Sequence, residues 1–557
     1  MRERILPPAA VPALAGLVTL AAGAAVLAPE ASGATLPPVR PVMACADLKG
    51  LDLSRGSTFP ARVDSAEEAA AGARQVCVVK GYVAPQVNFE ARLPLEGWTQ
   101  RYLQLGCGGY CGGINLASPS ALRQSAGCAP AESGEMVVAS SDLGHRRAGT
   151  FFPDGVWAVG NPDAVVDFAY GANHKVAVTV KAVAKAFYGQ EPRYAYFNGC
   201  SDGGRQGLQE AQRFPEDFDG ILAGATTLDV TSTNTVWHGW NVRVNERPDG
   251  SAILTSDKIP ALADAVLKAC AGPDGLIADP RACRFDVNTL VCPPGRDDAS
   301  CLTREQADAA TRIWQGPVDE RGERLFPGGM PFGSERAWVG SMVPERPGDK
   351  VTLATASDYQ WSWDFPNYMS ALGEVTGITN RNMGFTRAGY ERLNRLQGLY
   401  DPTDPDLARF AARGGKLLMW HGWADSGSSA LGSLNYVTAV RERMGAEAAA
   451  GVVALYLVPG VYHCSGGPTP VKADYLSRLM AWVEDGEAPG AVSVAFEAGP
   501  KDPTVTKTVT VAPHAPAADP AADRTAWAGL ANYRPGAQTW CRREGAGLVC
   551  DSRAPSR

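Results

Sequence analysis

The sequence predicts an α/β fold, in which a parallel sheet alternates along the chain with helices. The first observation is the stretch from 193 to 225, where RYAYFNG predicts a buried strand, GGRQGLQEAQRFP a helix and FDGILAGA a second strand. Strand, sharp turn, helix and strand in this order make the βαβ unit of a parallel sheet. The second observation is an apolar strand followed by a polar loop, which recurs in GGKLLMWHGWAD and VVALYLVPGVYH around the helical stretch SLNYVTAVRERMG.

Earlier in the chain, the segments between Val76 and Gly108 (CVVKGYV, VNFEARLPL and RYLQLG) predict strands of the hairpin type. The glycine-rich run GCGGYCGGIN predicts a loop whose backbone approaches another group closely. MVVASSDLGH then predicts a buried strand, and HKVAVTVKAVAKAFYG a helix that ends at Gly189.

The alternation of predicted strands and helices is interrupted between residues 226 and 413. This region is rich in Pro and Gly and contains the aromatic cluster SDYQWSWDFPNY. We interpret it as an insertion that forms a lid over the site, with an independent accessory domain as the alternative. The predicted organisation is a signal peptide over 1–34, a core in two parts over 35–225 and 414–557, and the lid over 226–413.

Composition limits the classes of function. The chain has 557 residues, 45% of them hydrophobic, which is typical of a globular protein with a large core. Its net charge is -7 and no block of basic residues is present, so the electrostatic footprint of a nucleic-acid binder is missing. A small neutral or aromatic ligand is the better expectation.

The N-terminus resembles an export signal. A basic start is followed by an apolar run rich in Ala and Leu, and small residues lead to Ala34. An uncleaved membrane anchor is the alternative, although prolines interrupt the run. Because no other stretch is long and apolar enough to cross a bilayer, we expect a secreted or periplasmic protein with no stable membrane insertion after cleavage.

Thirteen cysteines agree with an oxidising compartment. Sequence does not fix their connectivity, but local pairing is the simplest expectation for eight of them. The expected pairs are Cys45 with Cys77, Cys270 with Cys283, Cys292 with Cys301, and Cys541 with Cys550. The pairing of Cys107, Cys111 and Cys128 is left open, and an odd total leaves at least one thiol outside intramolecular pairs.

The stretch GCSDG, residues 199–203, fits the G-x-S-x-G nucleophile elbow, with a strand before it and a helix after it. Ser201 is the candidate nucleophile; a serine that only caps the helix is the alternative. The usual chain order is Ser, then Asp or Glu, then His. Asp425 and His463 follow late strands in that order, whereas choosing His421 as the base leaves no acid in an obvious place between it and Ser201.

Cys200 precedes the candidate nucleophile and Cys464 follows the candidate base. A disulfide between them would hold the two loops together and keep serine and imidazole within hydrogen-bond reach. Two unrelated buried thiols are the alternative.

These motifs resemble the tannase and feruloyl esterase family of α/β-hydrolases, which includes a bacterial hydrolase of mono(2-hydroxyethyl) terephthalate. The matching stretches are GCSDGGRQGLQEAQRFPEDFDGILAGA, KLLMWHGWADSGSSAL and LYLVPGVYHCSGGP. The resemblance implies an α/β-hydrolase core with a large inserted lid and a disulfide between Cys200 and Cys464. It also implies Ser201 as nucleophile, His463 as general base, Asp425 as the group that orients it, and an oxyanion hole from the backbone N–H groups of Asp202 and Gly109.

The chain departs from that family in two places. Its members usually carry a calcium loop in the insertion, but here the loop is CAGPDGLIADPRAC, in which only Asp274 and Asp279 remain as carboxylate ligands. A structural Ca²⁺ there is one expectation, and a turn closed only by a disulfide is the other. The lid arginine that binds the substrate carboxylate in the terephthalate monoester hydrolase has no clear counterpart.

Aromatic residues of the insertion are the candidates for substrate binding. Trp338 lies in the stretch WVGS, which resembles the terephthalate monoester hydrolase, and Trp361 belongs to the aromatic cluster. Such rings stack on aromatic groups, although they more often simply pack the interior of a lid.

The sequence therefore predicts a secreted serine carboxylesterase that hydrolyses esters of aromatic, phenolic carboxylic acids through an acyl-enzyme, with no cofactor required for the chemistry. The alternatives are activity on mono(2-hydroxyethyl) terephthalate, another acyl-transfer serine hydrolase such as a peptidase or acyltransferase, and a binding protein on an inactive scaffold. The preferred acyl and alcohol groups and the oligomeric state are left open.

Overall fold

The computed structural model describes residues 33–53, 59–72, 74–114, 116, 127–147, 153–370, 376–464, 466–467, 469–515, 538–545 and 547–552. Within these residues, nine strands form one sheet in the order β1-β2-β3-β5-β4-β6-β7-β8-β9. The strands are β1 (Ala61–Ala71), β2 (Arg74–Val83), β3 (Val87–Pro94), β4 (Arg101–Leu105), β5 (Val137–Ser141), β6 (Tyr194–Cys200), β7 (Gly220–Gly224), β8 (Lys416–Gly422) and β9 (Val453–Val458).

The sheet is mixed. Strands β4 to β9 pair in parallel, whereas β2 pairs antiparallel with both β1 and β3, and β3 pairs antiparallel with β5. The predicted hairpin is present as β2 and β3, but β4 was wrongly grouped with it. Because β5 lies between β3 and β4, β4 belongs to the parallel part.

Helices occupy the connections between the parallel strands. They are α1 (Ala129–Glu132), α2 (Pro162–Val166), α3 (Ala172–Tyr188), α4 (Asp202–Arg213), α13 (Ala430–Met444) and α14 (Ala446–Ala450). Helix α15 (Tyr475–Glu484) comes after β9, the last strand of this sheet along the chain. Helix α3 ends where the sequence predicts, because Gly189 takes a left-handed conformation with φ +76°.

Both faces of the sheet are covered, which explains why its central strands are apolar throughout. Side chains alternate between the faces, so Phe197 packs with α3, α4 and α13 in one core, and Tyr196 packs with α15 in another. The arrangement is an α/β-hydrolase fold.

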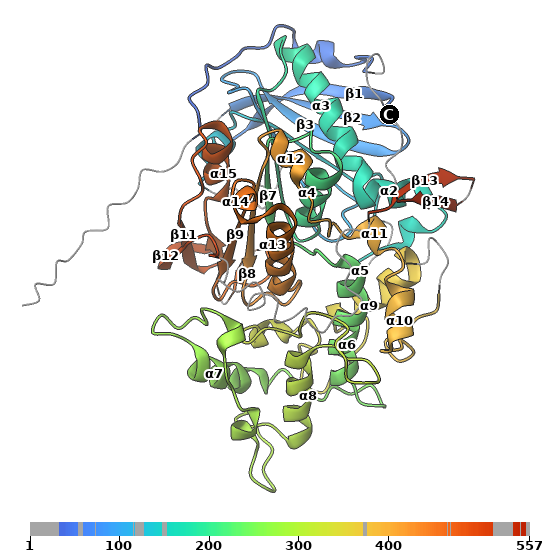
Figure 1. Cartoon of the computed structure of the whole chain (residues 1–557), viewed down its shortest axis with the longest axis vertical. Helices are drawn as coiled ribbons and strands as arrows, with labels where there is room; N and C mark the ends of the chain where they lie inside the picture. Colours follow the sequence, from blue (N-terminus) through green and yellow to red (C-terminus); the bar gives the residue numbers. More distant parts are fainter. Residues whose placement is uncertain are drawn as a thin grey trace, which may run out of the picture. The chain divides into compact units, whose positions relative to one another are not determined.

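The region between β7 and β8 is helical and includes α5 (Val230–Ser232), α6 (His238–Asn245), α7 (Ile259–Cys270), α8 (Arg304–Gln315), α9 (Ser357–Asp364), α10 (Arg387–Leu393), α11 (Gln397–Tyr400) and α12 (Ala408–Ala412). In Figure 1, α6, α7 and α8 lie beyond one end of the sheet. Trp237, Ile313 and Trp338 belong to an apolar core of this region, separate from the cores on the sheet. The division into core and lid at 226 and 413 stays a prediction.

Two small sheets complete the described part of the chain, one from β10 (Val471–Lys472), β11 (Val492–Gly499) and β12 (Asp502–Val511), the other from β13 (Trp540–Glu544) and β14 (Gly547–Asp551). The predicted signal peptide falls outside the described residues except for its last two. Among the described residues, none of the helices combines the length and the apolar character that a membrane crossing requires.

Candidate active site

Ser201 lies at a sharp turn between β6 and α4. Its backbone has φ +62° and ψ -123°, which is rare for a residue with a side chain. The turn requires glycine at its base, because a Cβ on Gly199 would lie 2.4 Å from the carbonyl oxygen of Gly203. This geometry is that of a nucleophile elbow, and it explains the spacing G-x-S-x-G.

His463 and Asp425 are brought to Ser201 from two other loops. The Nε2 atom of His463 lies 2.7 Å from Oγ of Ser201, and its Nδ1 lies 2.9 Å from Oδ2 of Asp425. Asp425 follows β8 and His463 follows β9, so the carboxyl ends of three parallel strands supply the three groups. Serine, imidazole and carboxylate thus form one continuous hydrogen-bonded chain.

Asp425 is fully buried and is held as an anion. The N–H groups of Gly427 and Ser428 donate to its Oδ1 at 2.7 and 2.9 Å, and Nε2 of His421 lies 3.2 Å from its Oδ2. Burial alone would raise the pKa of Asp425, but the charge of His463 and hydrogen bonds from both histidines outweigh it, so the pKa lies well below its usual range. His421 therefore binds the acid instead of replacing the base.

The pKa of His463 is shifted in the opposite direction. Burial lowers it, but the charge of Asp425 and the hydrogen bond to that carboxylate outweigh burial and raise the pKa above its ordinary value of 6.5. An imidazole in this environment can accept a proton from a hydroxyl at 2.7 Å.

A disulfide joins Cys200 to Cys464, with their Cα atoms 5.8 Å apart. It connects the residue before Ser201 to the residue after His463. The four local pairs expected from the sequence are also present, Cys45–Cys77, Cys270–Cys283, Cys292–Cys301 and Cys541–Cys550.

A sixth disulfide, Cys107–Cys111, lies in the glycine-rich loop after β4. This loop packs on the first turn of α4, since a Cβ on Gly203 would lie 3.2 Å from the carbonyl carbon of Gly106. Gly109 is part of the same loop and has φ +62°. Asp202 is the first residue of α4, where helix geometry leaves the backbone N–H without an intrahelical acceptor. That Gly109 and Asp202 form an oxyanion hole stays a prediction.

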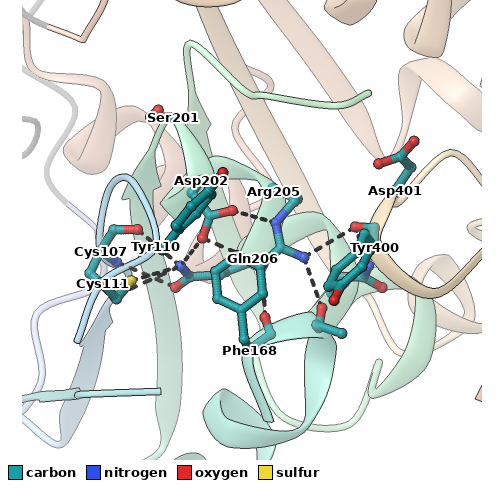
Figure 2. Close-up of polar contacts among 12 residues, drawn as sticks. Cys107, Tyr110, Cys111, Phe168, Ser201, Asp202, Arg205, Gln206, Tyr400 and Asp401 are labelled. Atoms are coloured by element: carbon teal, nitrogen blue, oxygen red, sulfur yellow. Dashed lines mark hydrogen bonds and ion pairs between the residues drawn. A yellow bond between two sulfur atoms is a disulfide. The ribbon is translucent and has the colours of Figure 1, made fainter. Parts of the chain in front are cut away.

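Gln206 links this loop to α4, as Figure 2 shows. Its Nε2 donates to Oδ2 of Asp202 at 2.7 Å and to the carbonyl of Cys107 at 2.9 Å. Its Oε1 accepts from the N–H of Cys107 at 3.3 Å and from Nδ2 of Asn173 at 3.1 Å. One buried amide thus ties the disulfide-closed loop to the residue that follows Ser201.

Arg205 completes this buried network. Its Nε donates to Asp202, and Nη1 and Nη2 donate to the carbonyls of Ala169 at 2.9 Å and Phe168 at 2.8 Å (Figure 2). Burial raises the pKa of Asp202 above its ordinary value, although Arg205 and Gln206 oppose that shift. Sequence reasoning missed this network; the only signal was the run of polar residues on a helix next to Ser201.

The two tryptophans expected to bind substrate are placed differently. Trp361 packs edge-on against Tyr110 of the glycine-rich loop, with ring centroids 5.1 Å apart. Trp338 does not lie at this site: it is fully buried in the core of the region between β7 and β8, and its Nε1 donates to Ser334. The prediction for Trp338 is therefore corrected to a packing residue.

The two carboxylates of the expected calcium loop are engaged with other groups. Both oxygens of Asp279 accept from the guanidinium of Arg281, at 2.7 to 3.1 Å. Oδ1 of Asp274 accepts from the N–H of Leu276, and Lys507 donates to the carbonyl of Asp274. A loop whose oxygens are bound by an arginine and a lysine does not suit a divalent cation. Within the described part of the chain, no group of three or more His, Cys, Asp or Glu side chains is arranged to hold a metal ion.

Comparison with known proteins agrees with this geometry. The profile of the family described as tannase and feruloyl esterase matches residues 71–523. An uncharacterized esterase of Xanthomonas campestris pv. campestris is 31% identical, covering 84% of this chain and 86% of its own. The mono(2-hydroxyethyl) terephthalate hydrolase of Piscinibacter sakaiensis is 30% identical, covering 77% and 79%.

The fold is shared with solved structures. The crystal structure of feruloyl esterase B from Aspergillus oryzae superposes with a TM-score of 0.70 at 23% identity, covering 83% of this chain and 94% of that one. The tannin acyl hydrolase of Aspergillus niger gives 0.64 at 19% identity, covering 88% and 90%. Since the family profile spans most of the chain, the protein belongs to the tannase and feruloyl esterase family and is a carboxylic ester hydrolase.

Proposed function

We propose that this protein is a secreted serine esterase that hydrolyses esters of aromatic carboxylic acids through an acyl-enzyme. The observation that carries the proposal is the continuous hydrogen-bonded chain from Ser201 through His463 to Asp425. A strained serine at the tip of an elbow, with an imidazole 2.7 Å away, has the geometry of an activated nucleophile.

In this mechanism Ser201 attacks the ester carbonyl while His463 takes the hydroxyl proton. The anion of Asp425 holds the imidazole in the tautomer that accepts at Nε2 and stabilises the imidazolium that forms. His463 then returns the proton to the leaving alcohol, and water attacks the acyl-enzyme along the reverse proton path. Backbone N–H groups of Asp202 and Gly109 would receive the developing oxyanion, and each such donor is worth about 3 kcal/mol in related enzymes.

Two observations support an aromatic acyl group. Trp361 and Tyr110 place aromatic rings at the loop that packs on the start of α4. Relatives in the family are named feruloyl esterases and a terephthalate monoester hydrolase. Secretion is supported by six disulfides, which persist in oxidising compartments, and by the signal-like N-terminus.

Activity on mono(2-hydroxyethyl) terephthalate is the second candidate, favoured by the 30% identity to that hydrolase. It is weakened because the lid arginine that the resemblance implies for the substrate carboxylate has no clear counterpart in this chain.

The test is acid release by the purified mature protein from methyl ferulate, methyl gallate and mono(2-hydroxyethyl) terephthalate, with Ser201→Ala as the control. We expect release that disappears in the variant, and the ranking of the three esters identifies the substrate branch. Release that persists in Ser201→Ala would contradict the serine mechanism. No release from any of the three by the wild type would contradict the aromatic substrate class.

A further inference from the structure

A cleft beside the loop that follows β8 gathers arginines and aromatic rings. Its volume is about 290 Å³, and the described residues that line it include neither Ser201 nor His463. It lies where the disulfide-closed turn ending at Cys283, the segment 324–332 and the first turn of α13 meet. We propose that this cleft binds a small aromatic carboxylate at a site separate from the hydrolytic centre.

The positive charge of the cleft is the first reason to expect that it binds a carboxylate. Arg281, Arg284 and Arg324 line the cleft, and no aspartate or glutamate is among its described lining residues. Because Arg281 is paired with Asp279 outside the lining, the charge offered to a ligand comes from Arg284 and Arg324. This local positive charge contrasts with the net charge of the whole chain, which is -7. Charge of one sign in a cleft with low-dielectric walls attracts the opposite charge.

The arginines keep donors for a ligand. Among contacts within the described residues, Arg284 uses Nη1 to donate to the carbonyls of Arg281 and Cys283, at 2.7 and 2.8 Å. Arg324 uses Nη1 to donate to the carbonyl of Pro327 at 3.1 Å. A guanidinium has five N–H donors, so these backbone contacts fix the two side chains and leave a fork that suits a carboxylate.

The N-terminus of α13, which lies at the cleft, is the second reason to expect that an anion binds there. This fifteen-residue helix begins at Ala430, and its N-cap Ser429 makes no side-chain capping bond. Ser429, Ala430 and Leu431 all line the cleft. The unsatisfied N–H groups and partial positive charge of a helix N-terminus favour an anion there, in addition to the arginines.

Aromatic side chains on the walls of the cleft indicate that the part of the ligand beyond its carboxylate is an aromatic ring. Trp314 and Phe332 pack with centroids 4.8 Å apart, and Arg281 lies over the ring of Trp423 at 5.3 Å. All three rings line the cleft. Ligand pockets usually measure roughly 300 to 1,000 Å³, so this cleft accommodates a ligand of about one ring. A single aromatic ring that carries a carboxylate satisfies both the walls and the charge.

The experiment measures binding by titration calorimetry to the full mature chain carrying Ser201→Ala, with 4-hydroxybenzoate as the probe. In this background Arg284→Glu with Arg324→Glu reverses two exposed charges of the cleft. The matched control is Arg296→Glu with Arg304→Glu, which reverses two exposed arginines outside the cleft. Uncharged 4-hydroxybenzamide tests the need for the carboxylate.

We expect binding of one molecule per chain that weakens at least about tenfold in the cleft variant and by less than about twofold in the control. The amide should bind at least about tenfold more weakly than the acid. Equal affinity in both double variants, equal binding of acid and amide, or no binding would overturn the proposal. If the glutamates disturb folding, Arg284→Gln with Arg324→Gln gives the same comparison. The measurement involves no turnover, so its failure leaves the esterase proposal untouched.

Discussion

Asp425 is the residue on which the electrostatics of the candidate site depend. Among the residues that the structure describes, no arginine or lysine pairs with this buried group, and its charge is supported by two backbone N–H groups and two imidazoles. The same charge raises the pKa of His463, and His463 in turn helps to lower the pKa of Asp425, so each group contributes to the shift of the other. Removing that charge should therefore change both the rate and its dependence on pH.

Wild-type kcat/KM should fall as pH decreases through the pKa of His463 in the free enzyme, because only the neutral imidazole accepts a proton. Since that pKa is raised, the acidic limb should lie above the ordinary histidine value of 6.5. In Asp425→Asn the charge is lost while burial remains, so the limb should move to lower pH. The plateau should fall by up to about 10⁴-fold, as in a comparable triad. A pH–rate profile of both proteins checks this, and an acidic limb that stays in place would contradict the assigned coupling.

At the scale of elements, the candidate site depends on contacts between one helix and two loops. Ser201 directly precedes helix α4, the glycine-rich loop packs on the first turn of this helix, and the Cys200–Cys464 disulfide joins the end of β6 to the loop of His463. Gln206 makes the polar part of the first contact. We therefore regard Gln206 as a positioning residue for the proposed oxyanion donors.

Gln206→Met should lower kcat about tenfold, less than the 10² to 10³ lost with an oxyanion donor, while KM changes by less than about twofold. Affinity for an aryl trifluoromethyl ketone, which forms a tetrahedral adduct, should fall in parallel with kcat. Gln212→Met is the matched control, because Gln212 is a buried glutamine of α4 that donates to the carbonyl of Pro402 instead. An equal loss of kcat in both variants would show that Gln206 supports only the general stability of the fold and does not position the oxyanion donors.

Cys200→Ala with Cys464→Ala should lower both activity and the temperature of unfolding. The bridge spans a sequence separation of 264 residues, for which the chain-entropy model gives about 5.6 kcal/mol. The control is Cys541→Ala with Cys550→Ala, which opens only the pairing between β13 and β14. Differential scanning fluorimetry and ester hydrolysis check both pairs. A double variant of Cys200 and Cys464 with wild-type activity would show that packing alone positions the two loops.

The sequence was most informative where a local pattern carries its own geometry. The elbow at Ser201 was predictable because a strained turn leaves a fixed glycine spacing, and four disulfides because their partners lie close in sequence. Contacts between distant elements leave no such pattern. The position of β5 between β3 and β4, the amide of Gln206 on the glycine-rich loop and the burial of Trp338 depend on tertiary packing that spacing does not reveal.

For the whole molecule, the cysteine inventory gives a simple check of the fold. Thirteen cysteines form six disulfides and leave Cys128, which is buried. Burial raises the pKa of the Cys128 thiol to about 12, so the reactive thiolate is scarce near neutral pH. Native protein should show no reaction with Ellman's reagent, and protein in guanidinium chloride without reductant should release about one equivalent. Three or more equivalents would mean that one of the six pairs is open.

The Cys200–Cys464 bridge makes the chain between these residues, including all of 226–413, a covalently closed ring. A single protease cut anywhere in that ring would divide the backbone but not the molecule. The piece that carries Ser201 and the piece that carries His463 would stay joined through sulfur, and the nicked protein would separate only under reducing conditions. The segment between β7 and β8 could therefore be cleaved, lengthened or exchanged during evolution without detaching the nucleophile from its base.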